Sequence, residues 1–127
     1  MSRRTLYHGP DDDLTELVIE AFLYVYNAIG YGLFEVVYQR AMLVELARRN
    51  VPFESEVRFE LSHRGVSIGD YRADLIVGNR VVVECKAVEM ISKPHVSQIM
   101  TYLKATGLRT GLILNFGPEP KIRRVSR

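Results

Sequence analysis

The segment Asp-Leu-Ile-Val-Gly-Asn-Arg-Val-Val-Val-Glu-Cys-Lys, residues 74–86, determines how the rest of the chain is interpreted. It contains two β-branched runs, Leu75–Val77 and Val81–Val83, on either side of Gly78 and Asn79, which is the pattern of an antiparallel β-hairpin. Apolar residues occupy both faces of these runs, so we expect the strands to be covered on two sides. The sequence therefore predicts a buried hairpin at the centre of a sheet.

Three charged residues interrupt this hairpin: Asp74, Glu84 and Lys86. A half-buried carboxylate without a partner costs several kcal/mol, so each acid needs a cation or strong hydrogen bonds. The strand period places Glu84 and Lys86 on one face and turns Cys85 to the other. A two-residue loop would send Glu84 away from Asp74, whereas an odd loop sets the two carboxylates side by side. We therefore predict an odd or bulged loop.

Two adjacent carboxylates repel each other, which raises one pKa unless a divalent cation lies between them. Oxygen ligands from Asp and Glu suit Mg²⁺ or Mn²⁺, and the remaining positions suit water and a phosphate oxygen. Lys86 would point at the same place as Asp74 and Glu84. Such a group can activate water and stabilise charge on a phosphate. The hairpin thus predicts metal-dependent phosphodiester hydrolysis with these three residues as the catalytic set.

The chain of 127 residues, 47% of them hydrophobic, fits one globular domain. We assign this domain to residues 11–127, after a mobile N-terminal arm over residues 1–10. No long apolar run and no signal-sequence pattern occur, so we expect a cytoplasmic protein with no membrane association. The single cysteine, Cys85, cannot form an internal disulfide and is expected in the core.

Apolar spacing predicts three helices, over residues 14–28, over residues 33–49 and from Ser92 to about residue 105. Asp13 is the predicted N-cap of the first helix. Strands are expected over residues 54–61, 66–77, 81–86, 109–116 and 121–125. The second helix should bury one apolar face, consisting of Val36, Val37, Met42, Leu43 and Leu46.

Residues 109–127 contain five basic residues and one acid. A C-terminal region with this excess of positive charge suits contact with phosphate groups. Lys121, Arg123 and Arg124 fall on the predicted last strand, which we expect at an exposed edge of the sheet. They are our candidates for contacts with nucleic-acid phosphates, and a solvated terminal tail is the alternative.

The pattern Asp74 … Glu84-x-Lys86 resembles the signature of the PD-(D/E)XK nuclease superfamily, with Ala73 in place of the proline in that name. The resemblance implies an α/β/α sandwich with a restriction-endonuclease-like core and a mixed, mostly antiparallel central sheet. It also implies Mg²⁺ or Mn²⁺ as the cofactor. The carbonyl of Cys85 would then join the two carboxylates as a metal ligand.

A second stretch, Gly32-Leu33-Phe34-Glu35-Val36-Val37-Tyr38, matches the pattern that names the GxxExxY proteins, a small bacterial and archaeal group assigned to this superfamily. The likeness extends from Leu14 to Val125. The residues alone favour reading Glu35 as a solvated carboxylate at a helix start. The resemblance implies instead that Glu35 faces the metal, directly or through water.

Gln98 and Tyr102 lie on one side of the third predicted helix, where solvent exposure is the ordinary explanation. The spacing Gln98-x-x-x-Tyr102 resembles the additional motif of RecB-type nucleases, which implies that both residues position the nucleic-acid backbone.

The sequence therefore predicts a nuclease that acts on nucleic acid, with DNA favoured as the substrate. A homodimer is possible because so small a domain offers little surface for DNA. One alternative is a nuclease-fold module that binds nucleic acid or a protein partner with little or no turnover. Another is an interaction domain in which Asp74, Glu84 and Lys86 form an internal ion-pair network.

Overall fold

The computed structural model describes residues 11–127, and the N-terminal arm expected over residues 1–10 lies outside them. The elements in chain order are α1 (Asp12–Ile29), α2 (Glu35–Arg48), β1 (Phe53–His63), β2 (Val66–Val77), β3 (Val81–Lys86), α3 (Lys93–Thr106), β4 (Thr110–Phe116) and β5 (Pro120–Ser126). The five strands form one sheet in the order β1-β2-β3-β4-β5. The β3–β4 pair is parallel and the other neighbouring pairs are antiparallel, so the sheet is mixed and mostly antiparallel, as predicted.

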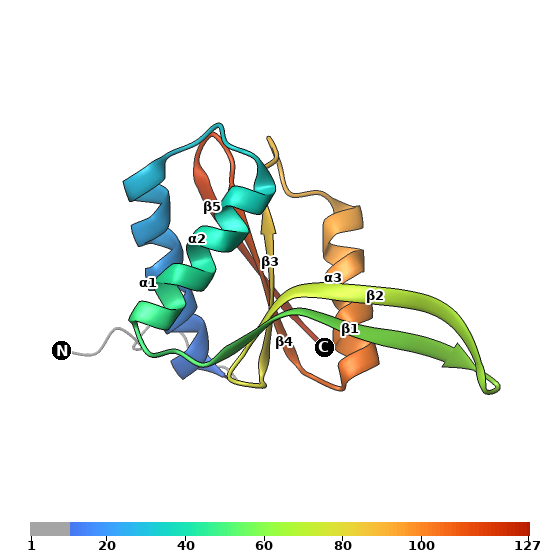
Figure 1. Cartoon of the computed structure of the whole chain (residues 1–127). Coiled ribbons are helices and arrows are strands. Elements are labelled where there is room, and N and C mark those ends of the chain that lie inside the picture. The colour runs from blue at the N-terminus through green and yellow to red at the C-terminus, as the bar shows by residue number, and fades with distance from the viewer. Residues whose placement is uncertain (1–10) are drawn as a thin grey trace.

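Helices cover both faces of this sheet: α1 and α2 lie on one face and α3 on the other (Figure 1). Two separate clusters of buried side chains fill the two interfaces. Strand β3 is buried along residues 81–85, as expected of a strand covered on two sides. This is the α/β/α arrangement of the restriction-endonuclease-like fold. Within residues 11–127, no helix is both long and apolar enough to cross a bilayer.

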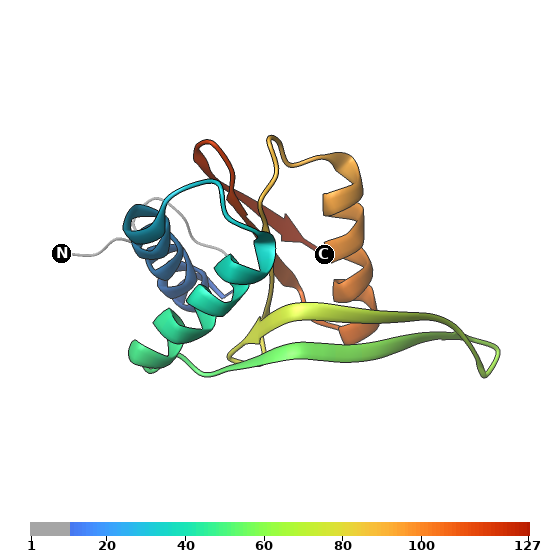
Figure 2. The ribbon, with the colours of Figure 1, turned by 45° about the horizontal axis from the view of Figure 1, so that its top comes forward.

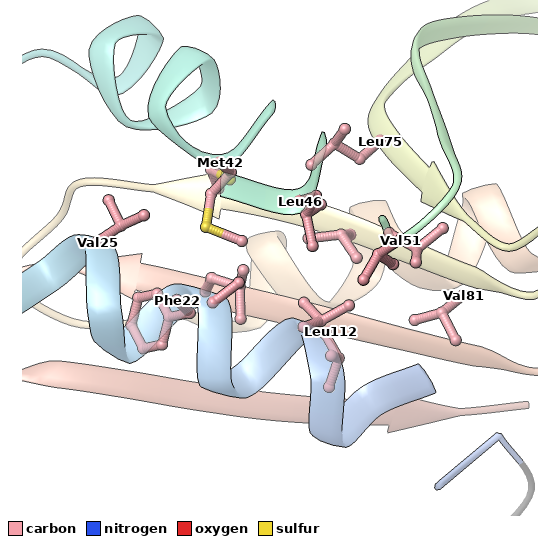
Figure 3. Packing of buried hydrophobic residues seen from close by; sticks show 14 of the residues in the cluster. Phe22, Val25, Met42, Leu46, Val51, Leu75, Val81 and Leu112 are labelled. Atoms are coloured by element: carbon pink, nitrogen blue, oxygen red, sulfur yellow. The ribbon is translucent and has the colours of Figure 1, made fainter. Parts of the chain in front are cut away.

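The larger core joins α1 and α2 to the sheet. Phe22 of α1 and Met42 and Leu46 of α2 are fully buried there, in one cluster with Leu75 and Leu112 of the strands (Figure 3). Each such side chain contributes about 1.5–3 kcal/mol through burial. The packing fixes α2 over the strands β2 and β3, which carry the predicted catalytic residues.

The loop of the central hairpin has an odd number of residues, as predicted. Strands β2 and β3 pair as Leu75 with Val83, Ile76 with Val82 and Val77 with Val81, which leaves three residues between them. The left-handed conformation falls on Gly78 (φ 58°) and Asn79 (φ 57°), residue types that tolerate it. Arg80 avoids that conformation, so the turn needs no strained arginine.

The first helix begins at Asp12, and the prediction of Asp13 as its N-cap was wrong. The preceding residue, Asp11, has a left-handed conformation and makes no side-chain cap. The Asp13 carboxylate instead accepts a 2.7 Å hydrogen bond from Arg80, on the hairpin loop. A guanidinium pairs with a carboxylate more strongly than a main-chain amide does, and this contact is invisible in the local sequence.

The buried face of α2 also differs from the prediction. Val36 and Val37 are 46% and 39% exposed, whereas Tyr38 is fully buried with Met42 and Leu46. The Tyr38 ring stacks on Phe116 of β4, with the ring centroids 4.3 Å apart. The large aromatic side chain therefore sets the rotation of the helix, and the smaller valines face outward.

We predict that Tyr38→Phe lowers the free energy of unfolding by about 1–3 kcal/mol. The Tyr38 hydroxyl donates to the carbonyl of Gly30 (2.6 Å) and accepts from the N–H of Leu33 (3.1 Å), so its loss leaves two loop groups without their partner. Urea denaturation would measure the change. Tyr24→Phe, at a tyrosine that is 57% exposed, is the matched control and should be nearly neutral. Equal stability of the two variants would contradict the role of this hydroxyl.

Candidate active site

Strand β2 pairs with β1 along most of its length but with β3 only over its last three residues. The β1–β2 hairpin consequently separates from the rest of the sheet at Asp74 (Figure 2). We call this point the strand fork. It leaves main-chain groups of β2 and β3 without a strand partner, in the gap that the two carboxylates occupy.

The carboxylates of Asp74 and Glu84 each accept a main-chain hydrogen bond across the strand fork. The main-chain N–H of Asp74 donates to Glu84 Oε2 (3.0 Å), and the main-chain N–H of Cys85 donates to Asp74 Oδ2 (2.9 Å). Each carboxylate thus accepts an amide of the opposite strand where the ladder has ended. The two side chains lie next to each other, as the odd loop predicts.

Burial makes both carboxylates difficult to ionise. Glu84 is only 4% exposed, and burial, followed by repulsion from Asp74, raises its pKa to about 8. Burial also raises the pKa of Asp74, which the hydrogen bond from Cys85 and one from the Gln39 side chain partly offset. In the described part of the chain neither acid forms an ion pair. The strand fork therefore contains two buried carboxyl groups without an ion-pair partner, and the charge of Lys86 only partly offsets the effect of burial on their pKa values.

Lys86 follows Glu84 on β3 and makes a polar contact with α3. Its ammonium Nζ donates to Gln98 Oε1 at 3.3 Å, and Gln98 Nε2 donates to the Tyr102 hydroxyl at 3.0 Å. Two side chains of α3 thereby hold the lysine from the side of the sheet opposite α2. Lys86 contacts Gln98 and forms no ion pair with Asp74 or Glu84, although its charge lowers the pKa of both acids. The alternative of an internal ion-pair network is therefore limited to this longer-range attraction.

Cys85 lies between the two charged residues but faces the other way, as predicted. Its side chain is fully buried in the core formed with α1 and α2, and burial raises the pKa of its thiol well above the ordinary value. The N–H and C=O of a strand residue point to the same side of the strand. Since the Cys85 N–H meets Asp74 in the strand fork, its carbonyl is directed toward the same gap.

Tyr102 does not lie on the surface where we expected it to contact nucleic acid. Its side chain is only 3% exposed, and its ring packs edge-on against Phe59 and Tyr71 of the β1–β2 hairpin. Burial raises its pKa to about 12, so the hydroxyl keeps its proton. The structure gives Tyr102 a supporting role, in which its hydroxyl orients Gln98. Gln98 itself is exposed and remains a candidate for contact with substrate.

Helix α2 brings two polar residues toward the strand fork. Glu35, its first residue, is half-buried, and its charge contributes to the raised pKa of Glu84. Gln39, one turn later, hydrogen-bonds to the Asp74 side chain and lines a cavity of about 100 Å³ beside it. We had not predicted Gln39. The signal was its spacing of four residues from Glu35, which places both on one side of a helix.

A divalent cation fits the strand fork by its donor chemistry. Residues 11–127 hold no group of three or more His, Cys, Asp or Glu side chains arranged around one point, so Glu35 does not join the two acids directly. The available donors are the carboxylates of Asp74 and Glu84 and the carbonyl of Cys85, all oxygen atoms. Mg²⁺ and Mn²⁺ prefer such ligands and keep other positions for water or phosphate. A cation would also stabilise the ionised form of both buried acids.

The three predicted basic residues of β5 divide between the two faces of the sheet. Val125 packs into the core under α3, so strand alternation places Arg123 and Lys121 on that face. Both are exposed, and Lys121 lies 3.7 Å from Glu119. Arg124 faces the other way and donates to the Thr15 hydroxyl of α1 (3.1 Å). The expectation that Arg124 contacts phosphate is therefore not supported, because its guanidinium packs against α1.

Comparison with known proteins identifies the family. A sequence model described as the PD-(D/E)XK nuclease superfamily matches residues 12–125. The chain belongs to this superfamily. Nucleases of the PD-(D/E)XK superfamily generally depend on divalent metal ions and act on nucleic acid. The match does not assign the chain to the GxxExxY group. No curated protein matched the chain.

Solved structures show the same fold. The crystal structure of the protein SSO0001 is similar at a TM-score of 0.62 with 19% sequence identity; the match covers 92% of this chain but 60% of SSO0001. This chain thus spans less than two thirds of that protein. An alkaline exonuclease from Laribacter hongkongensis, LHK-Exo, is similar at a TM-score of 0.53 with 11% identity, over 94% of this chain and 72% of the exonuclease. At such identities the likeness establishes the restriction-endonuclease-like fold of the superfamily.

Proposed function

We propose that this member of the PD-(D/E)XK superfamily is a metal-dependent phosphodiester hydrolase that cleaves nucleic acid, with DNA as the favoured substrate. The observation that carries the proposal is the pair of buried carboxyl groups, Asp74 and Glu84, that share the strand fork without an ion-pair partner. Superfamily membership and the exonuclease fold of LHK-Exo support the same reaction class.

In this proposal Asp74, Glu84 and the Cys85 carbonyl hold Mg²⁺ or Mn²⁺, and Glu35 acts from α2 through a water molecule. A divalent ion at this position would supply Lewis-acid stabilisation of the charge that develops on the phosphate. A hydrogen bond from Gln39 favours the ionised form of Asp74 and orients its carboxylate, against the larger effect of burial. These residues would bind the ion and place the scissile phosphate next to it.

Lys86 acts on the phosphate or on the attacking water. An ammonium group has three N–H donors, and the contact with Gln98 uses one of them. The remaining donors are available to a phosphate oxygen or to a water molecule. Gln98 and Tyr102 hold the Lys86 amine in place before the reaction. Less conformational entropy of Lys86 is therefore lost on reaching the transition state.

Binding of the nucleic acid would extend beyond the strand fork. The exposed side chains of Gln98, Lys121 and Arg123 offer polar and basic contacts for the sugar-phosphate backbone. A domain of this size provides little surface for a duplex, so we include a homodimer in the proposal.

Titration with Mn²⁺ tests the metal site directly. We expect calorimetry to detect binding to the wild-type protein and at least about tenfold weaker binding to Asp74→Asn, because the substitution removes one charged ligand. Asp70→Asn, at an exposed acid of the same strand, is the matched control and should bind like the wild type. Thermal melts would establish that all three proteins are folded. Equal Mn²⁺ affinity in wild type and Asp74→Asn would refute the metal site.

One observation favours a second function, a nuclease-fold module that binds nucleic acid without turnover. The strand fork brings together two carboxylates, and within residues 11–127 no third acidic ligand completes the group. This function predicts affinity for oligonucleotides with no cleavage in either Mg²⁺ or Mn²⁺. A cleavage assay on the same oligonucleotides that are used for binding separates the two proposals.

A further inference from the structure

A second polar cavity lies between the start of α3 and strand β5. Its volume is about 290 Å³, and its lining consists of Ile91, Ser92, Lys93, Val96, Ser97 and Arg123. Two serines and two cations form the polar part, and Ile91 and Val96 pack against the core beneath. We call this the α3–β5 cavity. No residue of the strand fork lines it.

The two cations of this cavity are unbalanced. Lys93 and Arg123 form no ion pair and no side-chain hydrogen bond with any residue between 11 and 127. Two positive charges from segments far apart in sequence therefore meet at one cavity, which favours an anion there.

The main chain of α3 contributes little to this preference. Ser92 caps the helix reciprocally with His95, and the N–H of Ser92 donates to His95 Nδ1 at 3.0 Å. Pro94 has no N–H to offer. The amides of His95 and Val96 both donate to the Ser92 carbonyl, at 3.1 and 3.2 Å, so an anion in the cavity would be held mainly by side chains. Arg123 supplies a forked set of donors and Lys93 a mobile charge.

The α3–β5 cavity is close enough to the strand fork for one nucleic-acid strand to reach both. Arg123 pairs with Ile113, and Ile113 pairs with Glu84, so Arg123 and Glu84 lie two strand spacings from each other. That separation is about 10 Å. Gln98 is five positions after Lys93, which is about 140° around the helix, so these side chains lie on opposite flanks of α3. A strand that joins the sites would pass over the first turn of α3.

We propose that the α3–β5 cavity binds a phosphate group of the nucleic acid, one that is not the phosphate at the strand fork. The inference rests on the proposed function, because it assumes a nucleic-acid substrate. Lys93 and Arg123 balance the phosphate charge, and the Ser97 hydroxyl supplies a further donor. Binding there fixes the path of the strand across α3 and so determines which phosphodiester lies at Asp74 and Glu84.

The test compares Lys93→Ala/Arg123→Ala with Lys104→Ala/Arg109→Ala, which removes the same charge from exposed positions outside the cavity. Fluorescence anisotropy would measure binding of a labelled single-stranded oligonucleotide in EDTA, over a series of salt concentrations. We expect the cavity variant to bind about tenfold more weakly, and the slope of log affinity against log salt concentration to fall by about 1 or more relative to the control. Equal affinity and slope in both variants would overturn the inference.

Oligonucleotides with a 5′-phosphate or a 5′-hydroxyl identify the source of the phosphate. A wild-type preference for the 5′-phosphate that vanishes in the cavity variant assigns the cavity to a terminal phosphate. Equal wild-type affinities, lost equally in the cavity variant, assign it to an internal phosphodiester. If the wild-type protein cleaves nothing in Mn²⁺ but the cavity variant binds the oligonucleotide more weakly, the phosphate site is upheld and the proposed hydrolase is refuted. If the wild-type protein cleaves and the cavity variant binds as tightly as the control, the hydrolase is upheld and the phosphate site is refuted.

Discussion

Replacing Lys86 by alanine should reduce metal-dependent cleavage by a factor of about 100–1000 while Mn²⁺ binding persists. The substitution removes a cationic donor that acts on the transferring phosphate, and loss of one such donor typically has an effect of this size. The carboxylates and the Cys85 carbonyl stay in place, so the ion should still bind. Cleavage rates of an oligonucleotide in Mn²⁺, with calorimetry on the same preparations, would measure both properties.

Two comparisons make this result specific to Lys86. Lys104→Ala removes the same charge from an exposed site on α3 and should leave the cleavage rate unchanged. Asp74→Ala should lose cleavage and Mn²⁺ binding together, because Asp74 is a ligand. A Lys86→Ala protein that is folded in thermal melts and cleaves at the wild-type rate would exclude Lys86 from the reaction.

The strand fork could be predicted from the sequence because its geometry depends on strand parity. Both apolar runs were recognisable, and only an odd loop brings Asp74 and Glu84 to one place. The residues at the turn agree, since Gly78 and Asn79 accept the left-handed conformation. Local rules of this kind need no knowledge of distant contacts, which is why the hairpin and the mixed sheet were predicted correctly.

The errors occurred where a distant residue decides how a side chain is oriented. Phe116 is 78 positions after Tyr38 in the chain, and the stacking of these two rings determines which face of α2 is buried. Strand alternation along β5 gives the face of the sheet on which Arg124 lies, but only the position of α1 shows that its guanidinium contacts Thr15. Neither contact leaves a periodic signal in the sequence.

The flank of α3 that carries Gln98 and Tyr102 illustrates the same limit. The spacing correctly placed both residues on one side of the helix, and the structure joins them by a hydrogen bond. The sequence could not show that the β1–β2 hairpin covers this flank with Phe59 and Tyr71. One residue of the pair is therefore exposed and the other is buried.

In the absence of divalent ions, the protein should become less stable as the pH rises from about 4.5 to about 8. The pKa of Glu84 is about 8 in the folded protein, against an ordinary value of 4.5. Between these values the folded state holds a proton on Glu84 that the unfolded state has released, so the effect of Glu84 on stability is most favourable below pH 4.5 and becomes unfavourable as the pH approaches 8. The raised pKa of Asp74 acts in the same direction. The contribution of Glu84 is up to about 5 kcal/mol.

Urea denaturation in EDTA across this pH range would measure the effect, and Glu84→Gln isolates its source. Glutamine cannot ionise, so the variant should lose the part of the pH dependence that Glu84 causes, whereas Glu60→Gln, at an exposed position of β1, should follow the wild type. Mn²⁺ should restore stability near pH 8, because an ion between the carboxylates favours the charged form that burial disfavours. If wild type and Glu84→Gln show the same pH dependence, Glu84 is already ionised below neutral pH. The burial of two uncompensated carboxylates would then no longer argue for a cation at the strand fork.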